Sequence, residues 1–421
     1  MHTFKIGIVA AFVVALARPS AGDDQAPATL GLADVLAQAR SQNPAIAAAR
    51  ERAKAASFAP VQASAYDDPT IGYEAWNAPE PFDLDHADNN ILKLSQRVPF
   101  PGKRSLAGKI AARDADVAGR RADAVELDVV AAVTRAYYGL WQAHQNLKIY
   151  SRDKQLVEQF ATIAEQKYAV GQVSQPDVLR AQVELTRLIN RVTTQTLGID
   201  GAAAELSALL SWPAASPLGV PENPPMPRLD ETAAALADRA LEKRPETSAA
   251  AAAVAREEEK VRMARLDYFP DFEFAVSRFF NFDHPDGVGL MASMSLPIAY
   301  KWKYDAALGE ADARLQSARA DLRRQQDRVR KEVEQAFVRA RTALLQRELY
   351  MTTHVPQAEQ ALAASQMAYQ TGKLDFLSLI DSVRAIESVH LEHVEAEASF
   401  EKAFADLERA VGGPLERGAA Q

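Results

Sequence analysis

The chain has 421 residues, of which 25% are charged and 48% are hydrophobic, and its formal net charge is −8. This balance excludes a disordered tail and a membrane protein built from apolar helices. The absence of cysteine excludes disulfides, thiolate metal sites, a cysteine nucleophile and lipidation at an N-terminal cysteine.

Residues 1–22 have the pattern of a secretory signal peptide. Lys5 precedes an uncharged run over residues 6–17, and small residues follow at 20–22. The run is too short to cross a bilayer, which takes about 20 apolar residues, but it suits the central region of a signal peptide. A buried N-terminal helix is the alternative, and the acidic pair Asp23-Asp24 that follows at once disfavours it.

Cleavage of this peptide changes the charge of the mature chain. It removes Lys5 and Arg18 and no acidic residue, which takes the net charge from −8 to −10 and argues against a nucleic-acid partner. No later segment approaches the apolar length of a transmembrane helix. A membrane role would therefore have to come from β-strands.

The first half of the mature chain predicts a helix, a hairpin and two very long helices. The first helix covers 32–65, and strands at 70–76 and 90–98 flank a polar loop. Residues 103–168 contain no proline, and an unbroken helix of this length reaches roughly 100 Å at 1.5 Å per residue. Such a helix must pack lengthwise against others. It ends at a turn with the pattern Tyr168-x-x-Gly171.

The second half repeats this order at an offset of about 200 residues. Asn43-Pro44 recurs as Arg244-Pro245, and the Tyr-x-x-Gly turn recurs at Tyr369 and Gly372. A helix is predicted over 231–266, strands over 272–280 and 288–298, and then two more long helices. Apolar residues follow a heptad spacing typical of coiled coils at Leu308, Leu315, Leu322 and Val329.

A proline-rich segment separates the two halves. The predicted organisation is a signal peptide (1–22), a first repeat (23–210), a linker (211–228), a second repeat (229–413) and a C-terminal tail (414–421).

The predicted strands point to assembly. Their lengths are close to the 9–11 residues, roughly, that a membrane strand needs. Four strands cannot close a barrel, since barrels begin at about eight. Two copies would supply eight strands and three copies twelve, and this argument leaves the number open. A soluble helical bundle is the alternative fold.

The sequence resembles the TolC-like outer-membrane factor family over nearly the whole mature chain, and most of all its heavy-metal efflux branch. The motifs that carry the resemblance are Asn43-Pro44, Val98-Pro99-Phe100-Pro101-Gly102-Lys103-Arg104, Tyr168-x-x-Gly171 with Asp177-Val178-Leu179-x-Ala181-Gln182, Arg244-Pro245-Glu246, Pro270-Asp271-Phe272 and Tyr369-x-x-Gly372-x-x-Asp375-Phe376-Leu377.

The resemblance implies a mainly α fold with a small β part. Long coiled-coil hairpins would form an α-barrel tunnel, and four transmembrane strands per protomer would form a twelve-stranded β-barrel in a homotrimer. The protein would sit in outer-membrane lipid, extend into the periplasm, and bind a periplasmic adaptor and an inner-membrane transporter of the RND type. The channel would carry no cofactor and no catalytic residues. The sequence also lacks the phosphate-binding, dinucleotide-binding, zinc-protease and serine-hydrolase motifs of common enzymes.

The resemblance also assigns roles to the two predicted turns. These would form the periplasmic tips that contact the adaptor, one through Gly171, Gln172, Val173 and Ser174, and the other through Gly372, Lys373, Leu374 and Asp375. Asp381 would contribute to an acidic ring at the aperture. The second ring position falls on Ser378, whose counterpart in the first half is Asp177. Plain helix capping and a solvated aspartate are the alternatives.

Both predicted hairpin loops contain an Asp-His-x-Asp pattern. Asp85, His86 and Asp88 recur as Asp283, His284 and Asp286. Imidazole and carboxylate groups can together bind divalent metals, so these extracellular loops are candidate metal sites. Ordinary polar loops are the alternative.

Two further features leave alternatives open. His390 and His393 share a helix face that is expected to be solvated or to lie between helices. Trp302, between Lys301 and Lys303, is expected either to anchor the protein at the membrane interface or to pack inside it.

The predicted function is a passive exit duct of a tripartite efflux pump for metal cations or small toxic compounds. One alternative is the outer-membrane channel of type I secretion. Another, of a different class, is a soluble periplasmic coiled-coil adaptor.

Overall fold

The computed structural model describes residues 29–78, 80, 87–224, 229–281 and 285–416. The predicted signal peptide lies outside these residues. The elements of the first half are β1 (Thr29–Leu30), α1 (Leu32–Gln42), α2 (Pro44–Ser64), β2 (Thr70–Trp76), β3 (Asn89–Val98), α3 (Lys103–Ala169) and α4 (Gln175–Leu210). Those of the second half are β4 (Val220–Pro221), α5 (Ala233–Lys243), α6 (Pro245–Leu266), β5 (Phe272–Asn281), β6 (Gly287–Met294), the π-helical turn η1 (Tyr300–Tyr304), α7 (Asp305–Leu349), the π-helical turn η2 (Tyr350–His354), α8 (Val355–Gln370) and α9 (Phe376–Val411).

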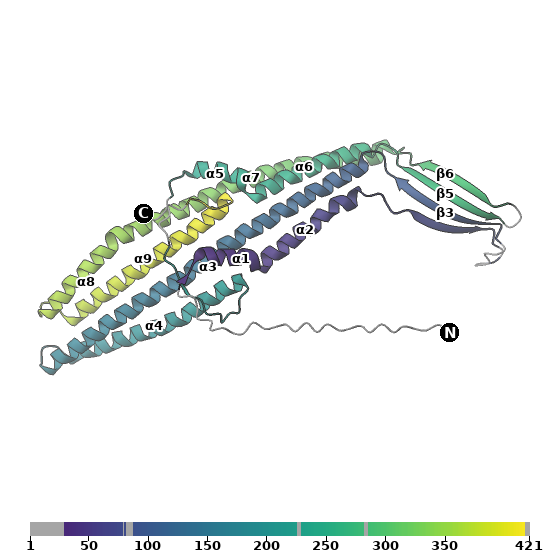
Figure 1. Cartoon of the computed structure of the whole chain (residues 1–421). Helices are drawn as coiled ribbons and strands as arrows, with labels where there is room; N and C mark the ends of the chain where they lie inside the picture. Colours follow the sequence, from purple (N-terminus) through teal and green to yellow (C-terminus); the bar gives the residue numbers. More distant parts are fainter. Residues whose placement is uncertain (1–28, 79, 81–86, 225–228, 282–284, 417–421) are drawn as a thin grey trace, which may run out of the picture.

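The molecule is an elongated rod with the sheet at one end and the hairpin turns at the other (Figure 1). The prediction of a mainly helical fold with long helices and four strands is confirmed. Helix α3 runs unbroken for 67 residues, about 100 Å at 1.5 Å per residue. The strands pair antiparallel in the order β2-β3-β5-β6.

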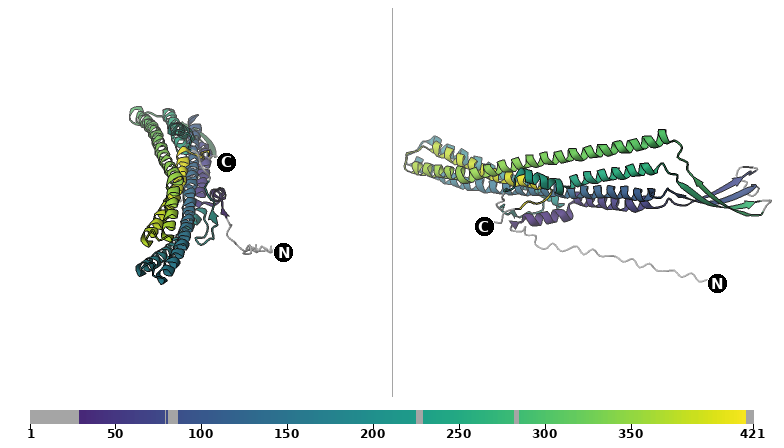
Figure 2. Two further views of the ribbon diagram at one scale, coloured as in Figure 1. Left: turned by 90° about the vertical axis from the view of Figure 1, so that its left-hand side faces the viewer. Right: turned by 90° about the horizontal axis from the view of Figure 1, so that it is seen from above.

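The long helices form one curved layer (Figure 2). Their packing order makes this layer four helices wide in each half. In the half near the sheet, α2 packs on α3, α3 on α6 and α6 on α7. In the half near the turns, α4 packs on α3, α3 on α9 and α9 on α7 and α8. The layer and the sheet therefore have the same width, with β2 following α2 on one side and α7 following β6 on the other.

Each predicted first helix is in fact two helices, and here the prediction was wrong. The 32–65 segment breaks at Asn43 (ψ 124°) and the 231–266 segment at Arg244 (ψ 127°). The cause is the proline that follows each residue, because its ring forces the preceding backbone out of the helical region.

These breaks are joints between chain segments. The Asn43 side chain accepts a hydrogen bond from the Ala45 N–H (2.8 Å) and donates one to the Leu209 carbonyl in the last turn of α4 (2.7 Å). The end of α4 thus meets the start of α2. In the second half Gly412, which caps α9 at φ +92°, lies against the backbone of Arg244. The end of α9 therefore meets the start of α6.

Two further predictions were too long. The last strand was expected to reach 298 but ends at Met294, which pairs with Phe272, the first residue of β5, and Pro297 has no N–H to continue a ladder. The long helix of the second half is interrupted by η2, just before Pro356. A wider π-helical turn accommodates a proline whose ring would clash with a regular preceding turn.

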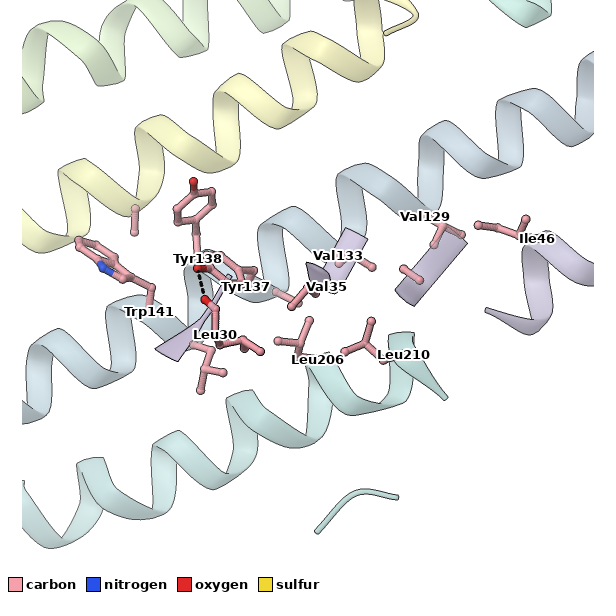
Figure 3. Packing of buried hydrophobic residues seen from close by; sticks show 14 of the residues in the cluster. Leu30, Val35, Ile46, Val129, Val133, Tyr137, Tyr138, Trp141, Leu206 and Leu210 are labelled. Carbon is pink, nitrogen blue, oxygen red and sulfur yellow. Dashed lines mark hydrogen bonds between the residues drawn. The ribbon is translucent and has the colours of Figure 1, made fainter. Parts of the chain in front are cut away.

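A buried cluster at mid-length anchors the connecting segments on α3 (Figure 3). Tyr137 is 1% exposed; its hydroxyl donates to the Leu30 carbonyl of β1 (2.7 Å) and accepts from the Glu222 N–H beside β4 (2.9 Å). Burial raises the pKa of Tyr137 to about 12. The small parallel pair β1–β4, which the sequence did not reveal, is held in place by this side chain.

We predict that Asn43→Ala lowers the free energy of unfolding by about 1–2 kcal/mol, because α2 loses its N-cap and Leu209 loses a donor. Thermal unfolding followed by circular dichroism measures the change. Ser57→Ala is the control, since the Ser57 hydroxyl makes an exposed hydrogen bond to the Lys54 carbonyl in the same helix. Equal melting temperatures for Asn43→Ala and the wild type would show that the joint is not structural.

Candidate functional site

One face of the four-stranded sheet is apolar and exposed. The register brings Ile71, Leu94, Val276 and Leu290 into one row across the sheet, with Leu290 84% exposed. Neighbouring rows on this face add further exposed apolar residues, namely Tyr73, Leu92, Phe274, Phe280, Val288 and Met294. Arg278 interrupts this face between Leu92 and Val288. A largely apolar surface of this kind marks contact with a partner or a membrane.

The opposite face has small and polar residues in its middle rows, although Ile91, Phe279 and Met291 also lie on it. The next row contains Gly72, Lys93, Ser277 and Gly289, and the hydroxyls of Thr70 and Ser95 are hydrogen-bonded at 2.7 Å. Apolar residues on one face and polar residues on the other are typical of strands between lipid and water. Among the described residues, no helix combines the length and apolarity of a membrane span.

The sheet and the helical layer both end in unpaired edges. Strands β2 and β6 each have one neighbour in the sheet. On the matching helical edges, α4 exposes Leu179, Val183 and Leu197, and α7 exposes Val338, Leu345 and Leu349. At 100° per residue, each set lies opposite the buried side of its helix. The protomer is thus an elongated, curved layer of sheet and helices with apolar edges along its length. We call this layer a slice.

A partly buried carboxylate joins the sheet to the helices. One oxygen of Asp271 accepts from the Phe100 N–H (2.9 Å) and the Lys103 ammonium (2.8 Å), and the other from Arg97 (3.1 Å). Phe100 and Phe269 stack beside it with centroids 4.6 Å apart. Burial alone would raise the pKa of Asp271, but these hydrogen bonds outweigh burial and hold the pKa below its usual value.

The two predicted turns are present at the far end of the rod. Gly171 and Gly372 have φ of +73° and +72°, a backbone conformation that favours glycine. Ser174 and Asp177 form a capping box at the start of α4, and Asp375 caps α9 by accepting from the Ser378 N–H (2.9 Å). Both turns are therefore closed by local hydrogen bonds, and they present exposed side chains at Gln172 and Lys373.

The helices behind the turns are joined by a buried core and a charged network. Tyr369 packs edge-to-face on Phe376, and the Lys167 ammonium donates to the Tyr369 carbonyl at 2.9 Å. Further along, Glu184 is 1% exposed and accepts from Arg187 on α4 and Arg384 on α9.

Burial opposes ionisation of Glu184, but the two arginines outweigh it and its pKa is lowered. Arg187 also reaches Glu387 on α9 at 2.8 Å. The network ties the first helical hairpin to the second. Sequence reasoning missed it, although charged residues of opposite sign, Glu184 and Arg384, follow the two turns at similar distances.

The residues predicted for the aperture occupy three different environments. The Asp381 side chain is 61% exposed on α9, with Arg384 at 3.6 Å. Ser378 is half-buried beside the cap of α9. Asp177 is engaged by Ser174 and by Arg180 at 3.5 Å. Of the three, Asp381 is the most available to line an aperture.

The candidate metal loops are only partly described. Asp85, His86, Asp283 and His284 lie outside the described residues. Asp88 accepts from Asn77 (2.9 Å), and Asp286 pairs with Arg278 (3.0 Å). Within the part of the chain that the structure describes, no group of three His, Asp or Glu side chains could hold a metal ion.

His390 faces other helices, one of the two environments expected for it. It is buried beside Arg152 of α3, and its Nε2 lies 3.6 Å from Glu359 of α8. Burial is the main cause that lowers its pKa, and Arg152 adds to the shift.

Comparison with known proteins agrees with this geometry. The pattern of the outer membrane efflux protein family matches residues 35–211 and again residues 236–413. Two relatives are similar at low identity. Protein CyaE of Bordetella pertussis is 28% identical over 250 residues, 58% of this chain and 52% of that protein. The cobalt-zinc-cadmium resistance protein CzcC of Cupriavidus metallidurans is 20% identical over 77% of each chain. The chain thus spans about half the length of CyaE.

Solved structures show the same fold. CusC superposes with a TM-score of 0.78 at 16% identity, covering 91% of this chain and 92% of that one. VceC of Vibrio cholerae gives 0.73 at 19% identity over 91% and 97%. The open state of MtrE of Neisseria gonorrhoeae gives 0.75 at 17% over 93% and 91%.

A slice with one lipid-type sheet face, long helical hairpins and apolar edges defines a subunit of a tubular membrane channel. The chain belongs to the outer membrane efflux protein family, the TolC-like channels. It is an outer-membrane efflux channel that extends into the periplasm and is not an enzyme. This excludes the soluble adaptor that the sequence had left as an alternative.

We predict that Asp271→Asn destabilises the protein by about 2 kcal/mol at neutral pH, because Lys103 loses the closer of its two charged partners and keeps only Asp267 at 3.5 Å. The native pKa of Asp271 is lowered, so its contribution is present above the unfolded value, about 4, and fades as the pH falls through the native value. The difference in melting temperature from the wild type should therefore shrink below pH 4.

Asp68→Asn, at an exposed position just before β2, is the control for this effect. If the difference in melting temperature between Asp271→Asn and the wild type stays constant from pH 7 to pH 3, the ionised Asp271 does not stabilise the junction of sheet and helices.

Proposed function

We propose that the chain is the passive exit duct of a tripartite efflux pump and works as a homotrimer. The observation that carries this proposal is the pair of unpaired edges. Three copies would place β6 of one protomer beside β2 of the next in an antiparallel, twelve-stranded barrel. The same rotation would join the apolar edge of α4 to the edge formed by α7 and α8 and close a helical tunnel.

The two turns are proposed as the contact with a periplasmic adaptor that couples the channel to an RND-type inner-membrane transporter. Their exposure, their hydrogen-bonded caps and their place at the far end of the rod support this role. Asp381 is proposed to form a ring of three carboxylates near the axis. These carboxylates would repel one another and attract cations. The periplasmic end would be closed at rest and dilate when adaptor and transporter engage the turns.

Metal cations are the proposed substrates. A net charge of −10 on the mature chain favours cations at a narrow passage, and CzcC, whose name refers to cobalt, zinc and cadmium resistance, is similar over most of this chain. The loops with Asp85, His86, Asp88, Asp283, His284 and Asp286 are proposed as weak metal-binding sites at the exit.

The proposed subunit contact predicts that charged substitutions on the apolar edge of α4 prevent trimer formation. In the combined variant Val183→Glu and Leu197→Glu, six carboxylates would enter the proposed seams of a trimer, and we expect the trimer to be lost while each protomer stays helical. Semi-native gel electrophoresis and light scattering measure the oligomer. Gln182→Glu with Thr196→Glu is the control and should leave the trimer intact, because each position is exposed and lies one residue, about 100° around α4, from a seam residue. Loss of the trimer in both variants, or in neither, would refute this seam.

The pump role predicts a phenotype. A deletion strain should become about tenfold more sensitive to Co²⁺, Zn²⁺ and Cd²⁺, and the wild-type gene should restore tolerance. Gln172→Asp with Lys373→Asp should fail to restore it, because the turns would no longer bind the adaptor, while trimer and outer-membrane location persist. The control, Gln62→Asp with Lys331→Asp, adds the same charge at exposed positions far from the turns.

Two other results would change the proposed substrate or the proposed transport system. Sensitivity to apolar drugs alone would make small toxic compounds the substrates. Loss of a secreted protein without any change in tolerance would favour type I secretion.

A further inference from the structure

The exposed apolar surface does not stop at the end of β6. On this strand the even-numbered residues face the apolar side, and the chain continues this spacing beyond Met294 with Leu296 (68% exposed) and Ile298 (81%). Trp302 in η1 is 87% exposed, so it does not pack inside the protomer. The apolar surface therefore reaches the first turn of the long helix, at the periplasmic end of the sheet.

A cluster of tyrosines fixes this turn. Tyr268 lies against Tyr300 and Tyr304, with ring centroids 6.1 Å and 5.6 Å apart, and its hydroxyl donates to Asp305. Residues 300 and 304 share one side of the π-helical turn, so residue 302 is directed to the opposite side. Lys301 and Lys303 flank it and are exposed.

The two lysines differ from three basic residues at the junction of β3 and α3. Arg97 and Lys103 are engaged by Asp271, and Arg104 lies over the ring of Tyr66 at 3.3 Å. Among the ion pairs of the described residues, none involves Lys301 or Lys303; Lys303 has only the Tyr304 ring, at 5.2 Å. Two ammonium groups thus remain available beside an exposed indole.

We propose that Lys301, Trp302 and Lys303 bind the headgroups of anionic phospholipids in the periplasmic leaflet of the outer membrane. The inference rests on the proposed trimer in that membrane. Trp302 would lie at the interface between acyl chains and headgroups, where indole is favoured. The lysines would bind the phosphate and its negative charge. Charge complementarity and continuity with the lipid-facing sheet favour lipid over a protein partner.

The test uses the processed full-length protein in nanodiscs of phosphatidylglycerol and phosphatidylcholine at 1:3. Native mass spectrometry counts the lipid of each class that stays bound. We expect the wild type to retain phosphatidylglycerol preferentially. Lys301→Gln with Lys303→Gln should weaken this preference by roughly 30-fold per site at low salt, from about 1 kcal/mol per lysine. High salt should reduce the wild-type preference.

Lys243→Gln with Lys331→Gln is the matched control, because both lysines are exposed and lie on the helical layer. An unchanged preference in Lys301→Gln with Lys303→Gln, or equal losses in both double variants, overturns the lipid site. Loss of the trimer in the first double variant with the lipid preference intact also overturns it and assigns the lysines to a subunit contact. A wild type that is monomeric or absent from the outer membrane contradicts the proposed function instead.

Discussion

The structure depends on one constraint. A single protomer cannot pair the backbone groups of its edge strands or cover the apolar residues of its edge helices. Sheet and helical layer are both four elements wide, and both end in unpaired or apolar surfaces. A strand edge left open in lipid costs several kcal/mol for each unpaired backbone group. A helix that exposes Val183 and Leu197 gains by covering them. The proposed association of copies would therefore complete the fold, and a tunnel through such a ring would follow from the curvature of the layer.

Association along the whole edge requires the sheet and the helical layer to keep the same width and to stay aligned. Short sequence motifs fix this alignment. Asp271 fixes the start of α3 to the start of β5 through Phe100 and Lys103. Asn43 joins α4 to α2, and Gly412 lies against Arg244 where α9 meets α6. The motifs that resemble the efflux family most clearly thus lie at the joints of the slice. They hold the edges in register, and the lumen and the lipid face are formed by residues with a looser pattern.

Much of the fold could be predicted from the sequence, because many elements depend only on residues that are close together in the chain. The strands 70–76 and 272–280, the proline-free helix from Lys103 and the turns at Gly171 and Gly372 could all be predicted, because each depends on residues close in sequence. The breaks at Asn43 and Arg244 were also locally determined by the following prolines and were missed. The β1–β4 pair and the network around Glu184 could not be predicted, because they depend on contacts between residues far apart in the chain.

The two halves share an order of elements but not a shape, and one of the differences arises at a single proline. Pro356 has no counterpart near 155–156, so α3 continues unbroken while the second long helix passes through η2 before α8. Breaks of this kind redirect a helix. The turns differ as well, since one carries Gln172, Val173 and Ser174 and the other Lys373, Leu374 and Asp375. In a trimer, two kinds of hairpin would therefore alternate around the axis, and an adaptor would meet neutral and charged turns in alternation. In the proposed trimer the periplasmic end would then present threefold, not sixfold, symmetry to an adaptor.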